Sequence, residues 1–221
     1  MERTFRILDL CCGAGGAGVG YQRAGFEVTG VDIAPQTNCP YETYVEDVLE
    51  WDDWDYDAIH FSPPCQRWTT MNATTTASSH PDLYTPMLPV LAATGLPYVI
   101  ENVPTSPLKP SLVLCGTMFD LVTKDSTKEL RRHRVFETNW RIKSPARSCN
   151  HTRPPVWAAG HSPNQEYRDL YGQCPMHERQ EAWGIDWMTR DELMESIPPA
   201  FTEFIGLQLI EHLRRKLETT T

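Results

Sequence analysis

A cysteine and a glutamate, each directly after a predicted strand, could serve as a nucleophile and a proton donor. Cys65 lies in the segment SPPCQ (residues 62–66), and Glu101 lies in the segment IENVP (residues 100–104), each directly after an apolar stretch typical of a strand. A thiolate is a strong nucleophile when its pKa is lowered, and a carboxyl group can hold or supply a proton. Taken singly, each also fits a plainer interpretation, a small buried thiol at a strand end and a solvated loop acid.

A pair of arginines follows further along the chain, in the segment LRRHRVF (residues 130–136). If Val135 and Phe136 open a strand, Arg132 and Arg134 project to the same face of it. Two guanidinium groups side by side suit a phosphate or an electron-rich base edge. A charged edge strand is the alternative interpretation.

A glycine-rich loop near the N-terminus indicates a ligand with a phosphate or nucleoside part. In DLCCGAGGAG (residues 9–18), Gly13, Gly15 and Gly18 have the G-x-G-x-x-G spacing between a predicted strand and a predicted helix. Such glycines let the backbone approach a ligand beside a helix N-terminus. Asp32 ends the next predicted strand, where an acid can bind ribose hydroxyls. The pattern alone fits a nicotinamide, a flavin or S-adenosylmethionine equally well, and a simple tight turn remains the alternative.

Alternating strand and helix patterns must position these residues. Apolar runs predict strands at 5–10, 27–32, 56–61, 97–101 and 112–115. Helical spacing marks 17–24, 178–183, 190–196 and 200–217, and also 83–93, which we expect to be broken or short because it contains Pro86 and Pro89. This alternation predicts an α/β fold with a doubly wound, mostly parallel sheet.

Two stretches without periodicity divide the chain. Residues 69–79 are rich in Thr, Ser and Asn and are expected to form a loop, and residues 139–178 are expected to form a small loop-rich insertion. We therefore expect an α/β core at 1–138, the insertion at 139–178, and C-terminal helices at 179–221 that return to the core.

Charge and composition narrow the class of protein. The chain has 20 Lys and Arg against 29 Asp and Glu, a net charge of −9, which is unusual for a nucleic-acid binder. Residues 126–153, however, hold eight basic residues against two acidic ones, so one face could bind a polyanion; an ordinary uneven surface is the alternative. The absence of a long apolar run argues against a membrane span, and seven irregularly spaced cysteines favour reduced thiols in a cytoplasmic monomer.

Taken together and in this order, the motifs resemble the DNA (cytosine-5) methyltransferase family. The segments at 9–16, 64–66, 101–103 and 132–134 are similar to its cofactor loop and to its Pro-Cys-Gln, Glu-Asn-Val and Arg-x-Arg motifs, and the segment AWGI (182–185) through Gly206 to its last two motifs. The resemblance covers residues 5–138 and 179–215. It implies a Rossmann-like fold, S-adenosylmethionine as cofactor and double-stranded DNA as partner. The cofactor residues it implies are Asp9, Leu10, Cys11, Gly13, Gly15, Asp32, Ile33, Asp47, Val48, Pro64 and Ser196.

The resemblance also implies a mechanism. The target cytosine leaves the helix, because its carbon 5 is unreachable while stacked. Cys65 adds to carbon 6, and Glu101 contacts the ring nitrogen opposite the glycosidic edge. Arg134, with Arg132, holds the base and a nearby phosphate. Carbon 5 takes the methyl group, and proton loss then expels Cys65. Asp9 is expected to order the glycine loop rather than to touch the methyl group. Residues expected to contact DNA are Gln66, Arg67, Arg141, Lys143 and Arg147.

The sequence departs from the family pattern in three places. Cys11 stands where the family often has Phe against adenine, and Glu195 stands where its last motif has an Asn that hydrogen-bonds the cofactor, so Glu195 is expected to weaken cofactor binding. The recognition region is about 40 residues, short for the family. We therefore expect a short or lax target sequence, in the style of compact virus-encoded methyltransferases that work in a host cytoplasm.

Two further possibilities stay open. Cys149, His151, Cys174 and His177 could supply four zinc ligands across the insertion, although their separation is not a standard finger spacing and unliganded thiols and imidazoles are the alternative. The substrate could instead be RNA or a free deoxycytidine nucleotide, or the chain could be a non-catalytic DNA-binding relative. The acidic total favours the former, whereas intact Cys65 and Glu101 argue against the latter.

Overall fold

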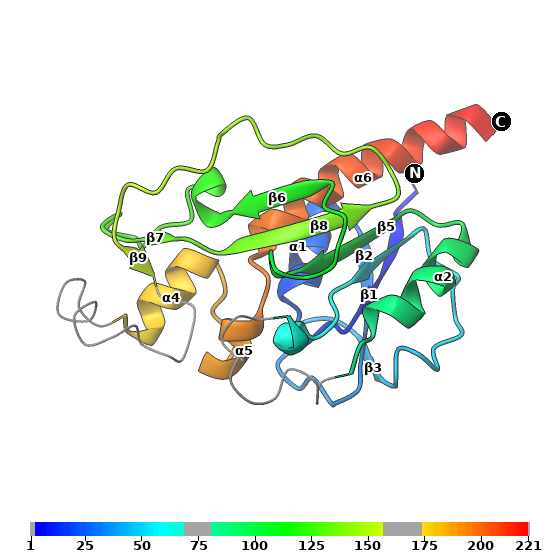
Figure 1. Cartoon of the computed structure of the whole chain (residues 1–221), viewed down its shortest axis with the longest axis horizontal. Coiled ribbons are helices and arrows are strands. Elements are labelled where there is room, and N and C mark those ends of the chain that lie inside the picture. The colour runs from blue at the N-terminus through cyan, green and yellow to red at the C-terminus, as the bar shows by residue number, and fades with distance from the viewer. Residues whose placement is uncertain (1–2, 69–80, 157–173, 221) are drawn as a thin grey trace.

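A single mixed sheet with helices on both faces forms the body of the protein. The computed structural model describes residues 3–68, 81–156 and 174–220 (Figure 1). The strands of the main sheet are, from one edge to the other, β3 (Thr43–Val45), β2 (Glu27–Asp32), β1 (Arg6–Leu10), β4 (Ala58–Phe61), β5 (Tyr98–Asn102), β8 (His133–Thr138) and β6 (Leu112–Cys115). β8 runs antiparallel to both of its neighbours, while the remaining pairs are parallel. The predicted doubly wound, mostly parallel α/β fold is confirmed.

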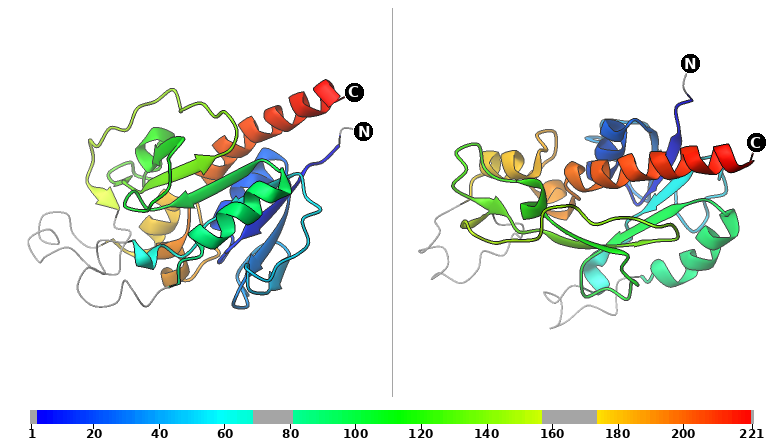
Figure 2. Two further views of the ribbon diagram at one scale, coloured as in Figure 1. Left: turned by 45° about the vertical axis from the view of Figure 1, so that its right-hand side comes forward. Right: turned by 90° about the horizontal axis from the view of Figure 1, so that it is seen from above.

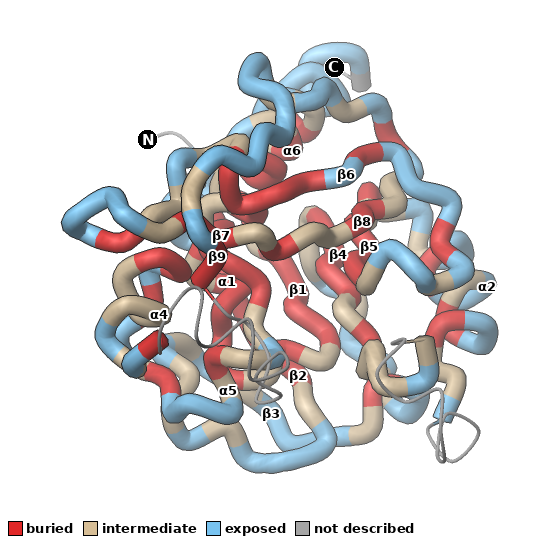
Figure 3. The backbone as a smooth tube through the Cα atoms, turned by 60° about the vertical axis from the view of Figure 1, so that its left-hand side comes forward, coloured by how far each residue is buried: buried red, intermediate tan, exposed pale blue. Residues whose placement is uncertain are grey.

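Alternating apolar side chains bury both faces of the sheet. Ile7 packs in the cluster beneath α1 (Gly16–Ala24) and α6 (Pro199–Thr220), whereas its neighbour Leu8 packs in the cluster beneath α2 (Tyr84–Thr94). Figure 2 shows α1 and α6 together on one face and α2 on the other, and Figure 3 shows the buried central strands between them. Parallel strands covered on both faces need such continuous apolar runs, which is why the sequence predicts them well.

The helix α2 differs from the expectation that two prolines would break it. Pro86 lies in its first turn, where the backbone N–H has no partner within the helix, so proline costs no bond there. Pro89 lies inside the helix, which nevertheless continues to Thr94. Packing of Tyr84, Met87 and Leu91 against the sheet maintains the helix across that position.

Part of the insertion packs onto the core. Residues 139–154 contain no helix or strand, and β9 (Pro155–Val156) then pairs with β7 (Glu129–Leu130) in a two-stranded sheet that the sequence did not predict. Val156 and Leu130 share a buried cluster with Trp183 of α4 (Met176–Trp183) and Leu193 of α5 (Arg190–Glu195). The predicted loop at 69–79 and part of the insertion lie outside the described residues. No helix among those described is long and apolar enough to cross a membrane.

A buried acid joins the first strand to the glycine loop. Asp9, on β1, is fully buried, and Tyr41 donates a hydrogen bond of 2.8 Å from its hydroxyl to Asp9 Oδ2. Asp9 Oδ1 has no partner within the described part of the chain. Burial raises the pKa of Asp9 to about 7, and the hydrogen bond from Tyr41 only partly opposes it. Asp9 thus carries a proton through much of the acidic range.

This raised pKa makes the free energy of unfolding depend on pH. Asp9 titrates near 4 in the unfolded chain, so its folded-state pKa is raised, and the stability that its proton contributes falls as pH rises toward 7. The free energy of unfolding of Asp9→Asn, relative to that of the wild type, should rise by about 2–3 kcal/mol between pH 5 and pH 8, because only the wild type loses this stability. Urea unfolding at both pH values measures this difference. The exposed Asp52→Asn serves as the control and should track the wild type, and an Asp9→Asn curve parallel to the wild type would contradict the assignment.

Candidate active site

One cavity at the carboxyl ends of the parallel strands collects residues from four separate motifs, the glycine loop and the Pro-Cys-Gln, Glu-Asn-Val and Arg-x-Arg segments. It has a volume of about 450 Å³, within the range of small-molecule sites, and it lies where the chain order reverses beside β1. Its walls come from the glycine loop, the turns after β2 and β4, the facing ends of β5 and β8, and α5. The predicted residues that line it are Cys11, Gly13, Asp32, Pro64, Cys65, Gln66, Glu101, Arg134 and Ser196.

Cys65 opens a short 3-10 helix (Cys65–Arg67) just after β4, and its position is fixed by Asn102. The Asn102 side chain donates a 2.9 Å hydrogen bond to the Pro63 carbonyl and accepts one of 2.8 Å from the Val103 N–H. Asn102 is therefore a positioning residue that ties the Glu-Asn-Val segment to the cysteine turn. Sequence reasoning missed this role, although Asn102 belongs to the motif it identified.

Burial decides the protonation of Cys65. It raises the pKa of the half-buried thiol, and the nearby positive charge of Arg134 opposes that shift, whereas Glu101 adds to it. The free protein therefore holds Cys65 mainly as a thiol at neutral pH. A nucleophilic thiolate would form by loss of this proton, and the charges of Arg134 and Arg132 favour it.

Glu101 and Arg134 form a buried ion pair across adjacent strands. Arg134 Nε lies 2.7 Å from Glu101 Oε1, with both side chains mostly buried. Burial raises the pKa of Glu101, and the charges of Arg134 and Arg132 oppose that shift. The contact lacks hydrogen-bond geometry, so Oε1 has no hydrogen-bond partner among the described residues. A carboxyl group held in this way, at the wall of the cavity, can supply a proton to a ligand.

Arg132 is close to this pair but does not line the cavity. It is buried, and its guanidinium lies over the Trp183 ring, 5.7 Å from the centroid. Its Nε and Nη2 have no hydrogen-bond partner within the described residues.

The glycine loop and Asp32 hold each other. Asp32 Oδ2 accepts a 2.9 Å hydrogen bond from the Gly13 N–H, and Oδ1 accepts one of 3.2 Å from Ala34 N–H. Gly13 has φ +49° and open space where a side chain would stand, which leaves its backbone facing the cavity. Gly15 has φ +85° and packs against Cys39 and Tyr41, so its role is in packing.

Several predicted cofactor residues do not line the cavity. Leu10 and Val48 are buried in the cluster beneath α2. Asp47 is partly exposed, and its carboxylate accepts a 2.9 Å hydrogen bond from the Leu49 N–H. Ile33, next to Asp32, is 70% exposed.

The C-terminal wall of the cavity is acidic. Asp191, Glu192 and Glu195 line it, together with Gln36, and sequence reasoning identified only Glu195 among these. Glu195 Oε1 lies 3.5 Å from Gln66 Nε2. Ser196 donates its hydroxyl hydrogen bond to the Leu193 carbonyl at 2.8 Å, so it closes α5.

The predicted DNA contacts separate into two groups. Gln66 lines the cavity, and Arg67 is exposed beside it. Arg141 and Lys143 lie instead along α6, where Lys143 N–H donates a 2.9 Å hydrogen bond to Gln208, and Arg147 pairs with Asp120. The antiparallel direction of β8 explains this, because it carries the chain from the catalytic edge to the opposite edge before residue 139. The structure does not bring Arg141 or Lys143 to Cys65.

The predicted zinc set is also divided. Cys174 is buried among Leu130, Val156 and Trp183, and His177 is exposed on α4. Within the described residues, Cys149 and His151 instead meet Cys115 and His133.

Comparisons with solved structures identify the fold. A protein named as a DNA modification methyltransferase encoded within an Escherichia coli prophage matches 96% of this chain and 100% of its own, at 15% identity and a TM-score of 0.62. The Entamoeba histolytica methyltransferase EhMeth matches 98% and 99%, at 15% identity and a TM-score of 0.58. The Schizosaccharomyces pombe Dnmt2 methyltransferase matches 95% and 99%, at 14% identity and a TM-score of 0.62.

Sequence comparison reaches less far. No protein-family model matches the chain. A Synechocystis methyltransferase, named as uncharacterized, is 35% identical over a 66-residue alignment, and the match covers 26% of this chain and 31% of that protein. The match thus spans about a third of the relative's length. From the sheet topology and the three full-length structural matches, the chain has the α/β fold of S-adenosylmethionine-dependent methyltransferases.

Proposed function

We propose that the protein transfers a methyl group from S-adenosylmethionine to carbon 5 of cytosine in double-stranded DNA, through a covalent adduct with Cys65. The observation that carries the proposal is the shared cavity. It holds a half-buried thiol, a buried carboxyl group and its arginine partner next to a glycine loop with its acid. The fold it shares with named methyltransferases supports the same reaction class.

The chain offers a site that fits the cofactor. Gly13 presents its backbone to the cavity without a side chain in the way, Asp32 borders the same wall, and Ile33 leaves an apolar surface beside it. These residues would hold the nucleoside part, and the turn at Ser196 would border the amino-acid part. When bound, S-adenosylmethionine supplies an electrophilic methyl group on its sulfonium. The acidic Glu195 at this wall is the residue that we propose to weaken binding.

The residues of the cavity divide the chemistry between them. The cytosine must be flipped out of the helix to reach the cavity. Cys65 Sγ forms a bond to carbon 6, and the electron pair of the 5,6 double bond becomes available at carbon 5. Glu101 donates a proton to the ring nitrogen opposite the glycosidic edge, and Arg134 keeps that carboxyl in place. After methylation, a water molecule takes the hydrogen of carbon 5 as a proton, the bond to Cys65 breaks to restore the thiolate, and the ring nitrogen returns its proton to Glu101.

DNA contacts near the cavity would come from a few residues. Gln66 and Arg67 follow the nucleophile directly, and Arg67 is exposed beside the cavity, where it could contact a phosphate next to the flipped base. The insertion at 139–178 offers about 40 residues from which to build a surface that reads sequence, and its described residues 139–154 contain no helix or strand. We propose that the target sequence is short or lax. Methylation mapping on genomic DNA tests this, and a long, strict site would contradict it.

The charges around Cys65 predict opposite effects of two substitutions on its pKa. Alkylation of Cys65 by iodoacetamide, followed by mass spectrometry across a pH series, should give a midpoint above the value of about 8.5 for a free thiol. Arg134→Gln should move the midpoint upward, because the opposing cation is gone, and Glu101→Gln should move it downward. Arg147→Gln, an exposed arginine outside the cavity, should leave it unchanged. A wild-type midpoint below about 8.5 would contradict the dominance of burial.

The covalent step is tested by trapping. Duplex DNA that carries 5-fluorocytosine, incubated with the protein and S-adenosylmethionine, should give a complex that survives denaturing electrophoresis, because fluorine cannot leave as the proton does. Cys65→Ala should abolish the complex, and Glu101→Gln should slow its formation by about 10²–10⁴-fold. Cys39→Ser, a thiol outside the cavity, should behave like the wild type. Trapping that persists in Cys65→Ala would exclude Cys65 as the nucleophile.

The nature of the substrate is tested separately with labelled cofactor. Duplex DNA, RNA and deoxycytidine nucleotides are offered in separate reactions, and we expect label in DNA. Label in RNA or in the nucleotide alone would show that the substrate is not DNA, although the proposed chemistry would be the same. Cofactor binding without transfer to any of the three pools would favour a non-catalytic DNA-binding protein.

A further inference from the structure

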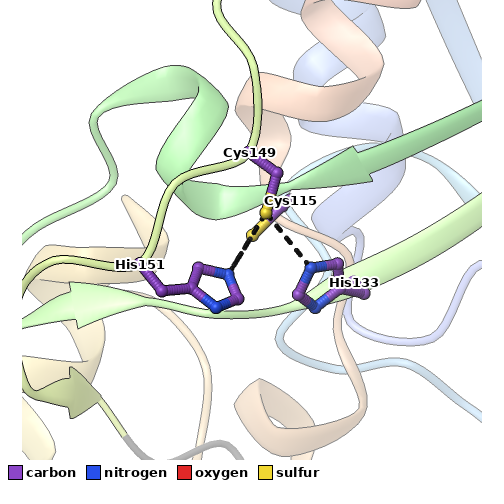
Figure 4. Close-up of side chains that lie close together, drawn as sticks. All are labelled: Cys115, His133, Cys149 and His151. Carbon is purple, nitrogen blue, oxygen red and sulfur yellow. Dashed lines mark hydrogen bonds between the residues drawn. The ribbon is translucent and has the colours of Figure 1, made fainter.

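Two cysteines and two histidines converge at the catalytic end of β6 and β8, outside the cavity (Figure 4). Cys115 ends β6 and His133 begins β8, and the antiparallel register places them directly opposite each other. Cys149 and His151 come from the segment that returns from the far edge of the sheet. Chain positions up to 36 residues apart therefore supply one cluster.

The four side chains have the spacing of a tetrahedral metal site. Cys115 Sγ lies 3.4 Å from His151 Nε2, Cys149 Sγ lies 3.4 Å from His133 Nε2, and Cys149 Sγ lies 3.2 Å from His151 Nε2. All four ligand atoms lie within 4.8 Å of one another. Zinc bonds of about 2.3 Å to sulfur and 2.0–2.1 Å to nitrogen, at tetrahedral angles, place neighbouring sulfur and nitrogen atoms roughly 3.5 Å apart.

The donor set also selects the metal. Two thiolates and two imidazoles favour zinc over calcium or magnesium, which prefer oxygen. The Thr117 hydroxyl lies 3.3 Å from Cys115 Sγ and 3.8 Å from Cys149 Sγ, where it can donate a hydrogen bond to a metal-bound thiolate. Four protein ligands would complete the coordination, so the arrangement is that of a structural site.

We propose that Cys115, His133, Cys149 and His151 bind one zinc ion that fastens the returning segment to the sheet. Residues 139–154 contain no helix or strand, and Cys149 and His151 are exposed, so little burial holds this part of the chain in place. A metal supplies the fixed cross-link that a core would otherwise give.

Because His133 directly precedes Arg134, the metal would also affect the ion pair between Arg134 and Glu101. His133 lies between Arg132 and Arg134, and successive side chains of a strand point to opposite faces. The zinc ion would therefore hold the first residue of β8 from one face while Arg134 contacts Glu101 from the other. Loss of the metal should loosen the strand that positions the buried ion pair.

Metal content tests the proposal without reference to methyl transfer. The full chain, produced with zinc in the medium and purified under reducing conditions, should contain one zinc per chain by elemental analysis. Cys149→Ser should bind zinc at least tenfold more weakly, and because Cys149 is exposed this variant is expected to fold. His177→Ala, an exposed histidine outside the cluster, is the matched control and should retain the metal.

Cobalt identifies the ligands. Cobalt added to the chelator-treated protein should give the visible bands of a tetrahedral site and a thiolate-to-cobalt charge-transfer band. The charge-transfer band should be weaker in Cys149→Ser, which has lost one of the two thiolates. Chelation should lower the melting temperature of the wild type but not of Cys149→Ser/His151→Ala. A wild-type chain that is free of metal and gives no cobalt spectrum would overturn the proposal. So would a mass two hydrogens below the reduced chain, with a Cys115–Cys149 disulfide in the peptide map.

Discussion

The ion pair between Glu101 and Arg134 is the interaction on which the arrangement of the site depends. Two buried charges must stay together, because removal of one partner from such a pair costs on the order of 3–5 kcal/mol. The pair links β5 to β8, and it requires β8 to run antiparallel so that Arg134 reaches the edge where β4 and β5 end. The direction of one strand therefore determines which residues share the cavity with Cys65.

Asn102 extends this dependence to the nucleophile. Its amide holds the turn before Cys65, and its neighbour Glu101 holds Arg134, so consecutive residues of β5 fix both sides of the cavity. Arg134 in turn acts on both Cys65 and Glu101. In the proposed reaction the thiol must lose its proton, whereas the carboxyl group must carry one. Arg134 favours the charged form of Glu101 and of Cys65, while burial favours the neutral form of both. The site thus holds a thiol and a carboxyl group whose protonation is sensitive to the same cation.

Much of this arrangement could be predicted from the sequence, because it rests on local patterns. The apolar runs fixed the central strands, and the residues that follow β1, β4 and β5 meet at one edge in any parallel sheet. What the sequence could not show has non-local causes. Nothing near Arg141 or Lys143 shows that β8 carries them to the far edge, and nothing near Cys149 shows that Cys115 and His133 are paired across two strands. Pro89 was misjudged because packing against the sheet, rather than local propensity, decides the length of α2.

The alternation of Arg132, His133 and Arg134 also constrains what changes this strand can accept. A shift of the β8 register by one residue would exchange the two faces, and it would place the imidazole in the cavity and a guanidinium among the cysteines. A slipped pairing of β8 is therefore disfavoured twice, because it would disrupt the ion pair on one face of the sheet and the cysteine and histidine cluster on the other. Insertions or deletions should be accepted in the segment after Thr138 far more readily than between Cys115 and Arg134, where the chain must arrive in a single register.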